Sequence, residues 1–590
     1  HFNDQRFDGV EITLDREPDD RLVAQIFDRV AAANDEAGRV EVPFDRLTPS
    51  EDDLWSRHCD EQLAVPLGRS GAQKNQELRL GIGTRQHALI AGRTGSGKST
   101  LLHVMITAAG MWYSPDELQM YLIDFKKGVE FKAYTGGRMP HVRAVAIESD
   151  REFGLSVLQR LDEELTTRGE LFRKLGAQNL QSARTMAPEE QLPRLLLLID
   201  EFQEFFTEDD EVSSEATLLL DRLVRQGRAF GVHVVLGSQT LAGAYSLARS
   251  TLGQIGVRIA LQCSETDSYL ILGEDNNAAR LLERPGEAIY NNAGGLVEGN
   301  SPFQTAWLSD AQRDEAIDQF PADTRDRPPA VVFEGNKPAV FEKSLEAFTK
   351  SYPDRSIPRL LLGDSVAIAP PSAPALSRRS GANLLVVSPQ PEPTTGMLIS
   401  SAITFSMTPS ARVVFIDPTP EDDTQFGVAR KLFQNKGIEI EVVDAASADR
   451  VVSEINAIVQ ERASGGGDPV LLVLNGIHRL RSLRKSDDYS FSLDEESASP
   501  DKELSNILLE GPERGIWVAG WCDTLSNLER AMDRSVIREF GLRVLMQMSA
   551  SDSTMLMDSS SASSLGANRA ILADDVAGTG VKLRPIEHSA

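Results

Sequence analysis

The chain contains several short apolar runs, each of which ends in a polar residue. The strongest consists of the leucines at 195–198 and Ile199, and Asp200 and Glu201 follow it directly. An unbroken apolar run of this length is typical of a strand buried on both faces of a parallel sheet. Because such sheets carry their sites at the carboxyl ends of the strands, Asp200 and Glu201 are candidate site residues.

Further apolar runs of this design occupy 87–90, 119–124, 231–238 and 257–261. The run 87–90 leads through a Gly-rich loop into the helical segment 101–106. Strands that alternate with helices in this way predict an α/β fold, with mostly parallel central sheets flanked by helices.

The Gly-rich loop fits the pattern G-x-x-x-x-G-K-S/T at every required position. Its glycines let backbone N–H groups converge on an anion, and the helix N-terminus adds a positive end. Lys98 would reach the β- and γ-phosphates, and the Ser99 hydroxyl would ligate Mg²⁺. The sequence therefore predicts a site for ATP and Mg²⁺, whose nucleotide-binding residues are Gly92, Thr94, Gly95, Ser96, Gly97, Lys98, Ser99 and Thr100.

Three polar residues after the buried runs complete the expected catalytic site. Asp200 would share the Mg²⁺ with Ser99, and Glu201 would polarise the attacking water. The alternative for Asp200 is a helix cap. Gln239, after the run 231–238, suits a sensor of the γ-phosphate, because an amide can report one phosphate oxygen.

Two arginines are candidates for an arginine finger that acts on a neighbouring subunit. Arg258 lies among apolar residues of the run 257–261, and Arg228 precedes the run 231–238. A charge in an apolar setting needs a partner or an interface. An ordinary salt bridge within the chain is the alternative for each of them.

Composition narrows the class of protein. A chain of 590 residues suggests about three or four domains. Its net charge of −27 argues against a whole-surface nucleic-acid binder, although a motor that grips nucleic acid inside a narrow pore stays possible. The three cysteines fit neither a zinc spacing nor a disulfide framework, which favours the reducing cytoplasm. We expect a fragment without a membrane segment, whose anchor or partner-binding region would lie upstream of His1.

The segment after about residue 355 repeats the first part of the chain. Gly231-Val232 matches Gly515-Ile516, and Gly256-Val257-Arg258 matches Gly541-Leu542-Arg543. From the two arginines onward, Gln, Ser and Asp-Ser recur at the same offsets, which indicates a duplicated domain.

The second copy has lost the chemical groups of the first. Pro393 stands at the position of Gly97, Thr394 stands at that of Lys98, and Asn475-Gly476 replaces Asp200-Glu201. Prolines remove N–H donors, and no ammonium is left for the phosphates. We expect this domain to be structural or regulatory.

The expected domain boundaries follow from these patterns. We expect an N-terminal helical or linker segment at 1–50 and an active ATPase domain at 51–325. A linker at 326–375 and a degenerate ATPase-like domain at 376–590 would complete the chain.

The motifs of the first domain resemble the FtsK/SpoIIIE branch of P-loop motors. The resemblance rests on 92–99, 122–126, Pro140-His141, Asp200-Glu201-Phe202, 227–233, 238–240 and Asp267-Ser268. It implies a RecA-like core in tandem copies, a hexameric ring with ATP bound between subunits, and a substrate threaded through the centre.

Two classes of this branch differ in substrate. FtsK-like translocases move duplex DNA, whereas EccC-like ATPases of type VII secretion move proteins and carry tandem, partly degenerate domains. The tandem layout and 124–128 are similar to the second class. We expect an ATP-hydrolysing motor on duplex DNA. The basic residues Lys126, Lys127, Lys132 and Arg249 are candidates for its pore loops, and ordinary solvated surface residues are the alternative for them. Polypeptide transport and an ATP-dependent scaffold without translocation are the alternatives.

Overall fold

The protein is described here from a computed structural model. It describes residues 19, 21, 23, 25–27, 29, 41–71, 74–125, 130–135, 137–147, 150–241, 249–321, 327, 330–334, 337–462, 466–485 and 499–588. Among these residues, no helix combines the length and the apolar character that a membrane crossing requires.

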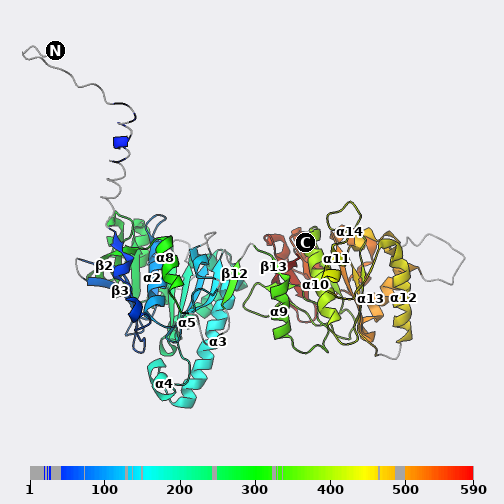
Figure 1. The fold of residues 1–590 in the computed structure, drawn as a ribbon, viewed down its shortest axis with the longest axis horizontal. Coiled ribbons are helices and arrows are strands. Elements are labelled where there is room, and N and C mark those ends of the chain that lie inside the picture. The colour runs from blue at the N-terminus through cyan, green and yellow to red at the C-terminus, as the bar shows by residue number, and fades with distance from the viewer. Residues whose placement is uncertain are drawn as a thin grey trace, which may run out of the picture. The chain divides into compact units, whose positions relative to one another are not determined.

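The chain divides into two compact units. The first comprises His1–Leu122, Lys132–Arg143 and Glu164–Ala330, and the second comprises Val331–Ala590 together with Ile123–Phe131 and Ala144–Glu163. Each unit contains mostly parallel strands with helices beside them (Figure 1). The expected α/β class with two sheets is therefore confirmed.

The first sheet has the order β12-β6-β5-β7-β8-β4-β9-β10-β11-β2-β3, with β1 beside β11. The pairs of β7 with β8, β8 with β4, and β4 with β9 are parallel, whereas β10, β11, β2 and β3 pair antiparallel. Its strands are β1 (Val42–Pro43), β2 (Leu63–Ser70), β3 (Lys74–Leu80), β4 (Ala88–Ala91), β5 (Leu118–Asp124), β6 (Val142–Ile147), β7 (Arg194–Asp200), β8 (Val232–Ser238), β9 (Val257–Leu261), β10 (Glu287–Asn291), β11 (Asn300–Trp307) and β12 (Val331–Glu334).

The α-helices of this part of the chain lie between these strands in sequence. They are α2 (Lys98–Trp112), α3 (Arg151–Leu175), α4 (Leu180–Met186), α5 (Glu211–Phe230), α6 (Arg249–Gly253), α7 (Glu265–Leu272) and α8 (Asp310–Asp318). Helix α2 is buried along nearly its whole length, which explains why its sequence is apolar on every side. It therefore holds the loop before it in a fixed position.

The second sheet has the order β13-β22-β21-β20-β15-β19-β18-β16-β17, with β14 beside β22. Its strands are β13 (Ala339–Val340), β14 (Gly363–Ser365), β15 (Leu384–Val387), β16 (Arg412–Ile416), β17 (Glu441–Val443), β18 (Val470–Leu474), β19 (Ile516–Cys522), β20 (Leu542–Leu545), β21 (Ala570–Asp574) and β22 (Thr579–Glu587). Its helices are α9 (Phe341–Ser351), α10 (Pro391–Ser406), α11 (Val428–Asn435), α12 (Ala448–Glu461), α13 (Pro500–Glu510), α14 (Leu525–Ala531), α15 (Arg534–Ile537) and α16 (Ala550–Met557).

The strand orders confirm the internal repeat. The sequence β7-β8-β4-β9-β10-β11 in the first sheet corresponds to β18-β19-β15-β20-β21-β22 in the second. In both sheets the first four of these strands are parallel and the last two pair antiparallel. A shared order of six strands, reached through crossovers, is the expected result of a duplicated domain.

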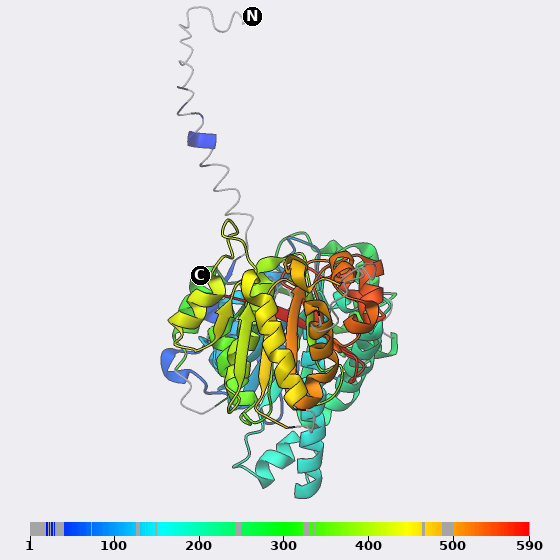
Figure 2. The same ribbon diagram turned by 90° about the vertical axis from the view of Figure 1, so that its right-hand side faces the viewer.

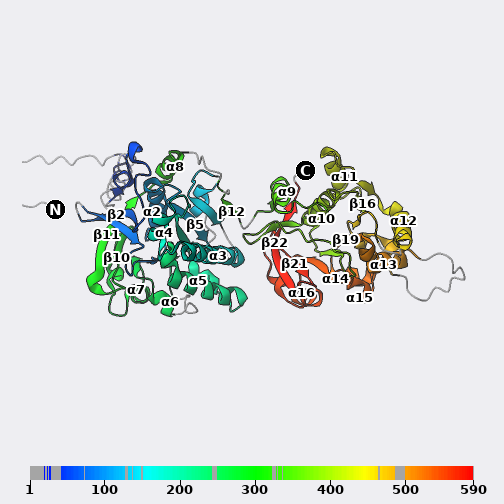
Figure 3. The same ribbon diagram turned by 90° about the horizontal axis from the view of Figure 1, so that it is seen from below.

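Alternation along the strands gives the second sheet two apolar faces. Leu384 and Val386 of β15 join a core with α9, α10 and α11, whereas Leu385 and Val387 join a core with α12 and α13. Figures 2 and 3 show the strands between helices on both faces. Burial on both faces accounts for the continuous apolar runs in these strands.

Two expected domain boundaries differ from the structure. The segment 326–375 was expected to be a linker, but it contains β12, β13, α9 and β14, and Phe341, Phe348 and Leu360 are buried in the core of the second unit. The residues after 41 belong to the first unit, because β1 pairs with β11 and Phe44 is buried. Apolar side chains buried on these segments are the physical reason for both differences.

The expected helix near the N-terminus lies largely outside the described residues. Positions 21, 23, 25–27 and 29 are helical, and Ile26 and Phe27 are exposed. The described residues therefore show no neighbour on which this apolar pair packs.

Candidate active site

The phosphate-binding loop connects the end of β4 to the start of α2. Gly97 is the N-cap of α2 and has φ +96°, and Gly95 has φ +80°. A Cβ on Gly97 would lie 2.9 Å from the backbone N of Gly286, so both conformation and space require glycine. The loop is held on neighbouring segments, since Gly92 N donates to Ser238 O (3.2 Å) and Gly286 N donates to Ser96 O (2.8 Å).

Local features of this loop fit a bound phosphate chain. The hydroxyl of Ser96 is buried and has no hydrogen-bond partner among the described residues. A Cβ on Gly92 would lie 2.5 Å from that hydroxyl, so only glycine leaves the space. An orphaned donor beside the positive end of a helix is the arrangement that an anion satisfies.

A buried ionic cluster lies next to the loop. The side chains of Lys98, Asp200 and Glu201 are each about 5–6% exposed. The Lys98 ammonium contacts Asp200 Oδ1 and lies 2.8 Å from Glu201 Oε1. Because β7 and β4 both flank β8 in parallel, their carboxyl ends bring Asp200 and the loop to one edge of the sheet.

The carboxylate of Glu201 is held in one orientation. Gln203 Nε2 donates to Glu201 Oε2 (2.7 Å), and the backbone N–H of Gln239 donates to the same oxygen (3.0 Å). Burial acts to raise the pKa of Glu201, but Lys98 and these donors outweigh it and hold the pKa below its ordinary value. Glu201 is therefore an ionised carboxylate that can accept a proton.

Asp200 is in the opposite electrostatic situation. Burial raises the pKa of Asp200 above its ordinary value, although Lys98 acts against this shift. Two carboxylates face one ammonium, so the cluster has an excess of negative charge. Oxygen ligands with this excess suit a hard divalent cation, and Asp200 with Ser99 would be its protein ligands.

Gln239 couples the loop to Glu201. Thr94 Oγ1 donates to Gln239 Oε1 (3.1 Å), while Gln239 N donates to Glu201. Gln239 therefore connects the phosphate-binding loop, through Thr94, to the carboxylate of Glu201. The sensor role of Gln239 stays a prediction.

The structure gives both finger candidates a position away from this edge. Arg258 lies at the start of β9, and its Nη1 donates to Ile271 O (2.8 Å) at the end of α7. Arg543 makes the same contact with Leu556 O (2.8 Å) in the second unit. Arg228 is exposed in the last turn of α5, directly before the amino end of β8. The finger role stays a prediction for Arg228 and Arg258.

Two supporting residues were not assigned roles from the sequence. Gln203 also accepts a hydrogen bond from Ser238 Oγ (2.9 Å), which connects β8 to the Glu201 loop. Asp267 accepts from Thr240 Oγ1 and from Leu241 N, both at 3.0 Å, and so fixes the segment after Gln239. The recurrence of Asp-Ser in both copies was a signal for Asp267, whereas Gln203 had none.

A cavity of about 180 Å³ adjoins the first turn of α2. Its lining includes Gly97 and Thr100 on one side and Pro285, Gln304 and Trp307 on the other. Its place beside the loop suits the part of a nucleotide that extends beyond the phosphates.

The corresponding loop of the second unit has another structure. Helix α10 begins at Pro391, so the positions that would surround a phosphate are wound into its first turn. Thr394 Oγ1 donates to Gln390 O (2.7 Å), and Thr395 Oγ1 donates to Asn475 Oδ1 (3.2 Å). Neutral hydrogen bonds therefore replace the ionic cluster of the first unit.

Some of the basic residues expected in pore loops can be placed. Lys132 is exposed in a short 3₁₀ helix, Glu130–Tyr134. Lys126 and Lys127 lie outside the described residues, and Arg249 begins α6.

The fold and the site define a P-loop nucleotide-binding domain in the first unit, followed by a second copy of its central strand order that lacks the loop. Residues 51–243 match the family model described as "FtsK/SpoIIIE family". The first unit therefore carries an FtsK/SpoIIIE-type domain, as the sequence motifs predicted.

The curated relatives fall into two groups. The chain is 30% identical over 293 residues to the ESX-5 secretion system protein EccC5 of Mycobacterium tuberculosis, covering 46% of this chain and 20% of that protein. It is 29% identical over 307 residues to the DNA translocase FtsK of Streptococcus agalactiae, covering 49% of this chain and 36% of that protein. The chain thus spans well under two thirds of the length of these relatives.

Solved structures share the tandem arrangement. The cytoplasmic domain of the type VII secretion ATPase EccC of Thermomonospora curvata has a TM-score of 0.61 at 20% identity, covering 93% of this chain and 67% of that one. ATPases 2 and 3 of EssC from Geobacillus thermodenitrificans have a TM-score of 0.53 at 13% identity, covering 92% of this chain and 98% of that one. At these identities the likeness establishes the fold.

Replacing Lys98 by alanine should abolish nucleotide binding and also destabilise the nucleotide-free first unit by about 3–5 kcal/mol, because two buried carboxylates lose their cation. Calorimetric titration with Mg–ATP and urea unfolding of the full chain would measure both effects. The loss of stability should shrink as the pH is lowered, since protonation of a carboxylate whose pKa is raised removes the uncompensated charge. Lys343→Ala, at an exposed site in α9, is the control. Unchanged unfolding of the Lys98 variant would contradict this account of the cluster.

Proposed function

We propose that the first unit binds Mg–ATP and hydrolyses it, and that the chain is part of a motor driven by this reaction. The observation that carries the proposal is the buried cluster of Lys98, Asp200 and Glu201 beside a loop built for phosphate. A buried cluster with excess negative charge is costly to keep unless a ligand uses it. The match of residues 51–243 to the FtsK/SpoIIIE family supports the same conclusion.

The contacts assign a role to each side chain in the reaction. On nucleotide binding, Lys98 would exchange its carboxylate partners for the β- and γ-phosphates, and Ser99 and Asp200 would hold Mg²⁺. Mg²⁺ supplies charge neutralisation at the phosphates. Freed from Lys98, Glu201 would orient a water molecule and accept its proton. Gln239 would link the state of the loop to Glu201 through Thr94.

Replacing Glu201 by glutamine should leave Mg–ATP binding intact and lower the turnover number by about 10²–10⁴-fold, because an amide cannot accept the proton. Single-turnover phosphate release and calorimetric binding would separate the two steps. Glu204→Gln, three residues further along, is the matched control and should keep normal turnover. Turnover by the Glu201 variant at the normal rate would remove this residue as the base.

We propose a ring, with six chains as expected from the sequence resemblance, as the active assembly. Mixing increasing amounts of the Glu201 variant into the wild-type protein tests this idea. If chains act together in a ring, activity should fall more steeply than the wild-type fraction. A strictly proportional fall in an assembled sample would argue for independent chains.

We propose that the second unit binds no nucleotide. The early start of α10, its prolines and the neutral pair Thr395–Asn475 support this proposal. Titration of the full chain with a slowly hydrolysed ATP analogue should therefore give one site per chain, and Lys98→Ala should leave none. A residual site in the Lys98→Ala variant would show that the second unit binds nucleotide after all.

Two substrates are supported by different observations. Duplex DNA, as expected from the sequence, is supported by the similarity to the DNA translocase FtsK. A polypeptide is supported by the tandem layout, which the EccC and EssC structures share over more than 90% of this chain. One such structure, from Thermomonospora curvata, is in complex with a signal sequence peptide.

ATPase assays on the assembled protein separate these substrates. If the motor moves DNA, duplex DNA should stimulate turnover, and the stimulation should weaken between about 50 and 200 mM salt as counterion release loses its advantage. Single-stranded DNA and a signal sequence peptide are the comparison ligands. Stimulation by the peptide without any response to DNA would favour the polypeptide substrate. No response to either ligand would favour the scaffold alternative.

A further inference from the structure

The strand registers show which residues of the second unit correspond to the site residues of the first. Val232 pairs with Leu195 in the first sheet, and Ile516, the matching residue of the repeat, pairs with Val470. Counting forward from these pairs places His478 at the position of Gln203. In the same way, Cys522 and Asp523 take the positions of Ser238 and Gln239.

The first unit uses these three positions to hold Glu201. Ser238 donates to Gln203, and Gln203 and Gln239 both donate to Glu201. In the second unit Gly476 stands at the position of Glu201, so these three positions have no carboxylate to hold. Yet the three positions carry imidazole, thiol and carboxylate, which are the residue types that bind Zn²⁺.

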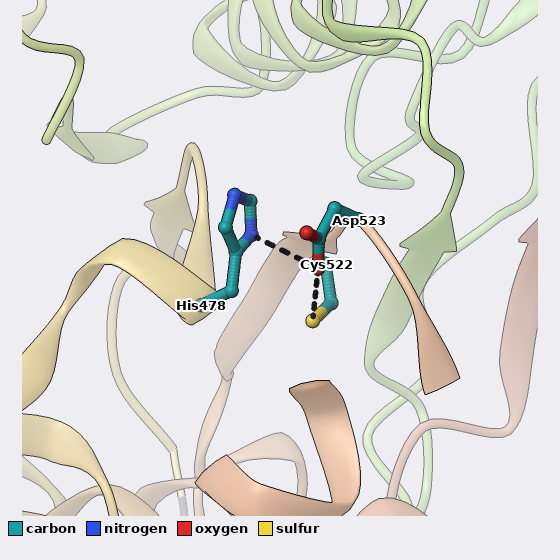
Figure 4. Close-up of side chains that lie close together, drawn as sticks. All are labelled: His478, Cys522 and Asp523. Atoms are coloured by element: carbon teal, nitrogen blue, oxygen red, sulfur yellow. Dashed lines mark hydrogen bonds and ion pairs between the residues drawn. The ribbon is translucent and has the colours of Figure 1, made fainter. Parts of the chain in front are cut away.

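The three side chains face one another at the carboxyl ends of β18 and β19 (Figure 4). His478 Nδ1 lies 3.8 Å from Asp523 Oδ1, and Cys522 Sγ lies 3.7 Å from the same oxygen. All three donor atoms lie within 4.8 Å of one another. Ligands of a tetrahedral zinc, with bonds of about 2.0–2.3 Å, are about 3.3–3.6 Å apart, so small side-chain shifts would close the site.

One of these donors lacks a partner. His478 Nδ1 is buried and forms no hydrogen bond among the described residues. The ring is held edge-on against Trp521, with centroids 5.1 Å apart, so it stays directed toward Cys522 and Asp523. A buried, oriented nitrogen without a proton partner is costly in the free protein and is satisfied by a metal ion.

The carboxylate is positioned from outside the cluster. Asn527 Nδ2 lies 2.9 Å from both oxygens of Asp523, and Thr524 N donates to Oδ1 (2.7 Å). Ligating carboxylates are held by such outer hydrogen bonds in metal sites. Cys522 is fully buried, whereas the Asp523 side chain is 31% exposed, so the cluster is open to solvent on one side.

We propose that the second unit binds one Zn²⁺ through His478 Nδ1, Cys522 Sγ and a carboxylate oxygen of Asp523, with water as the fourth ligand. The degenerate copy thus has a metal site at the edge where the first copy has its catalytic residues. Zinc binding releases the proton of the Cys522 thiol to solvent, and neither oxidation nor reduction takes place. This proposal does not depend on the proposed ATPase activity.

Metal analysis of the full chain, purified without a histidine tag, tests the site. After removal of metals with a chelator and addition of Zn²⁺, the wild type should retain about one zinc per chain. Cobalt, used as a coloured probe, should give an absorption band from thiolate ligation. Cys522→Ser and His478→Gln should each lower zinc affinity by at least about tenfold and remove that band or shift it.

The first control introduces the side chains that the first unit carries at the corresponding positions. The triple variant His478→Gln, Cys522→Ser, Asp523→Gln restores the residue types of the first unit and should bind no zinc while staying folded. Cys59→Ser, at another buried thiol, should keep zinc and the cobalt band. The proposal fails if the wild type retains no more zinc than the triple variant, or if the cobalt spectrum shows no thiolate.

Discussion

The proposed function of the first unit depends on one buried lysine and its two carboxylate partners. Lys98 is held between Asp200 and Glu201 in a site where each of the three side chains is about 5–6% exposed. A buried ionic cluster of this kind contributes little net stability, because desolvation offsets much of the attraction. We explain the cluster instead by the change of partners that it would allow on nucleotide binding. The ammonium has two carboxylate partners. In the proposed reaction it would leave both for a phosphate chain, which would release Asp200 for a cation and Glu201 for a water molecule.

This cluster is possible because the parallel sheet brings distant segments to one edge. Lys98 and Asp200 are about a hundred residues apart, and the pairing of β4, β8 and β7 places their segments side by side. Asp200 is the last residue of β7, and Gln239 follows β8. Both strands are buried along their whole length, which leaves little freedom to their ends. The precision of the site therefore derives from the core.

The sequence predicted the central strands well, since burial on both faces produces unbroken apolar runs such as 195–199. It did not predict β2, β3, β10 and β11. The hairpins β2–β3 and β10–β11 join through β11 and β2, which are far apart in sequence, and β3 is polar at most of its positions. The linker prediction for 326–375 relied on proline and charge and overlooked the apolar residues Phe341, Phe348 and Leu360. For the site, motif spacing named Lys98, Asp200 and Glu201. Gln203 needed the structure, because nothing in its local sequence distinguishes it from a surface glutamine.

The two copies show how one edge of a sheet can support different chemistry. The order of the central strands is the same in both, so the positions at their carboxyl ends are equivalent. In the first copy Gln203, Ser238 and Gln239 occupy these positions and hold the carboxylate of Glu201, whereas in the second copy His478, Cys522 and Asp523 occupy them. Cysteine spacing alone argued against zinc, because only one cysteine takes part and its partner His478 comes from another strand end. Because Gly476 stands at the position of Glu201, the surrounding positions of the second copy have no carboxylate to hold. The fold still held them close together, which is the condition a metal site requires.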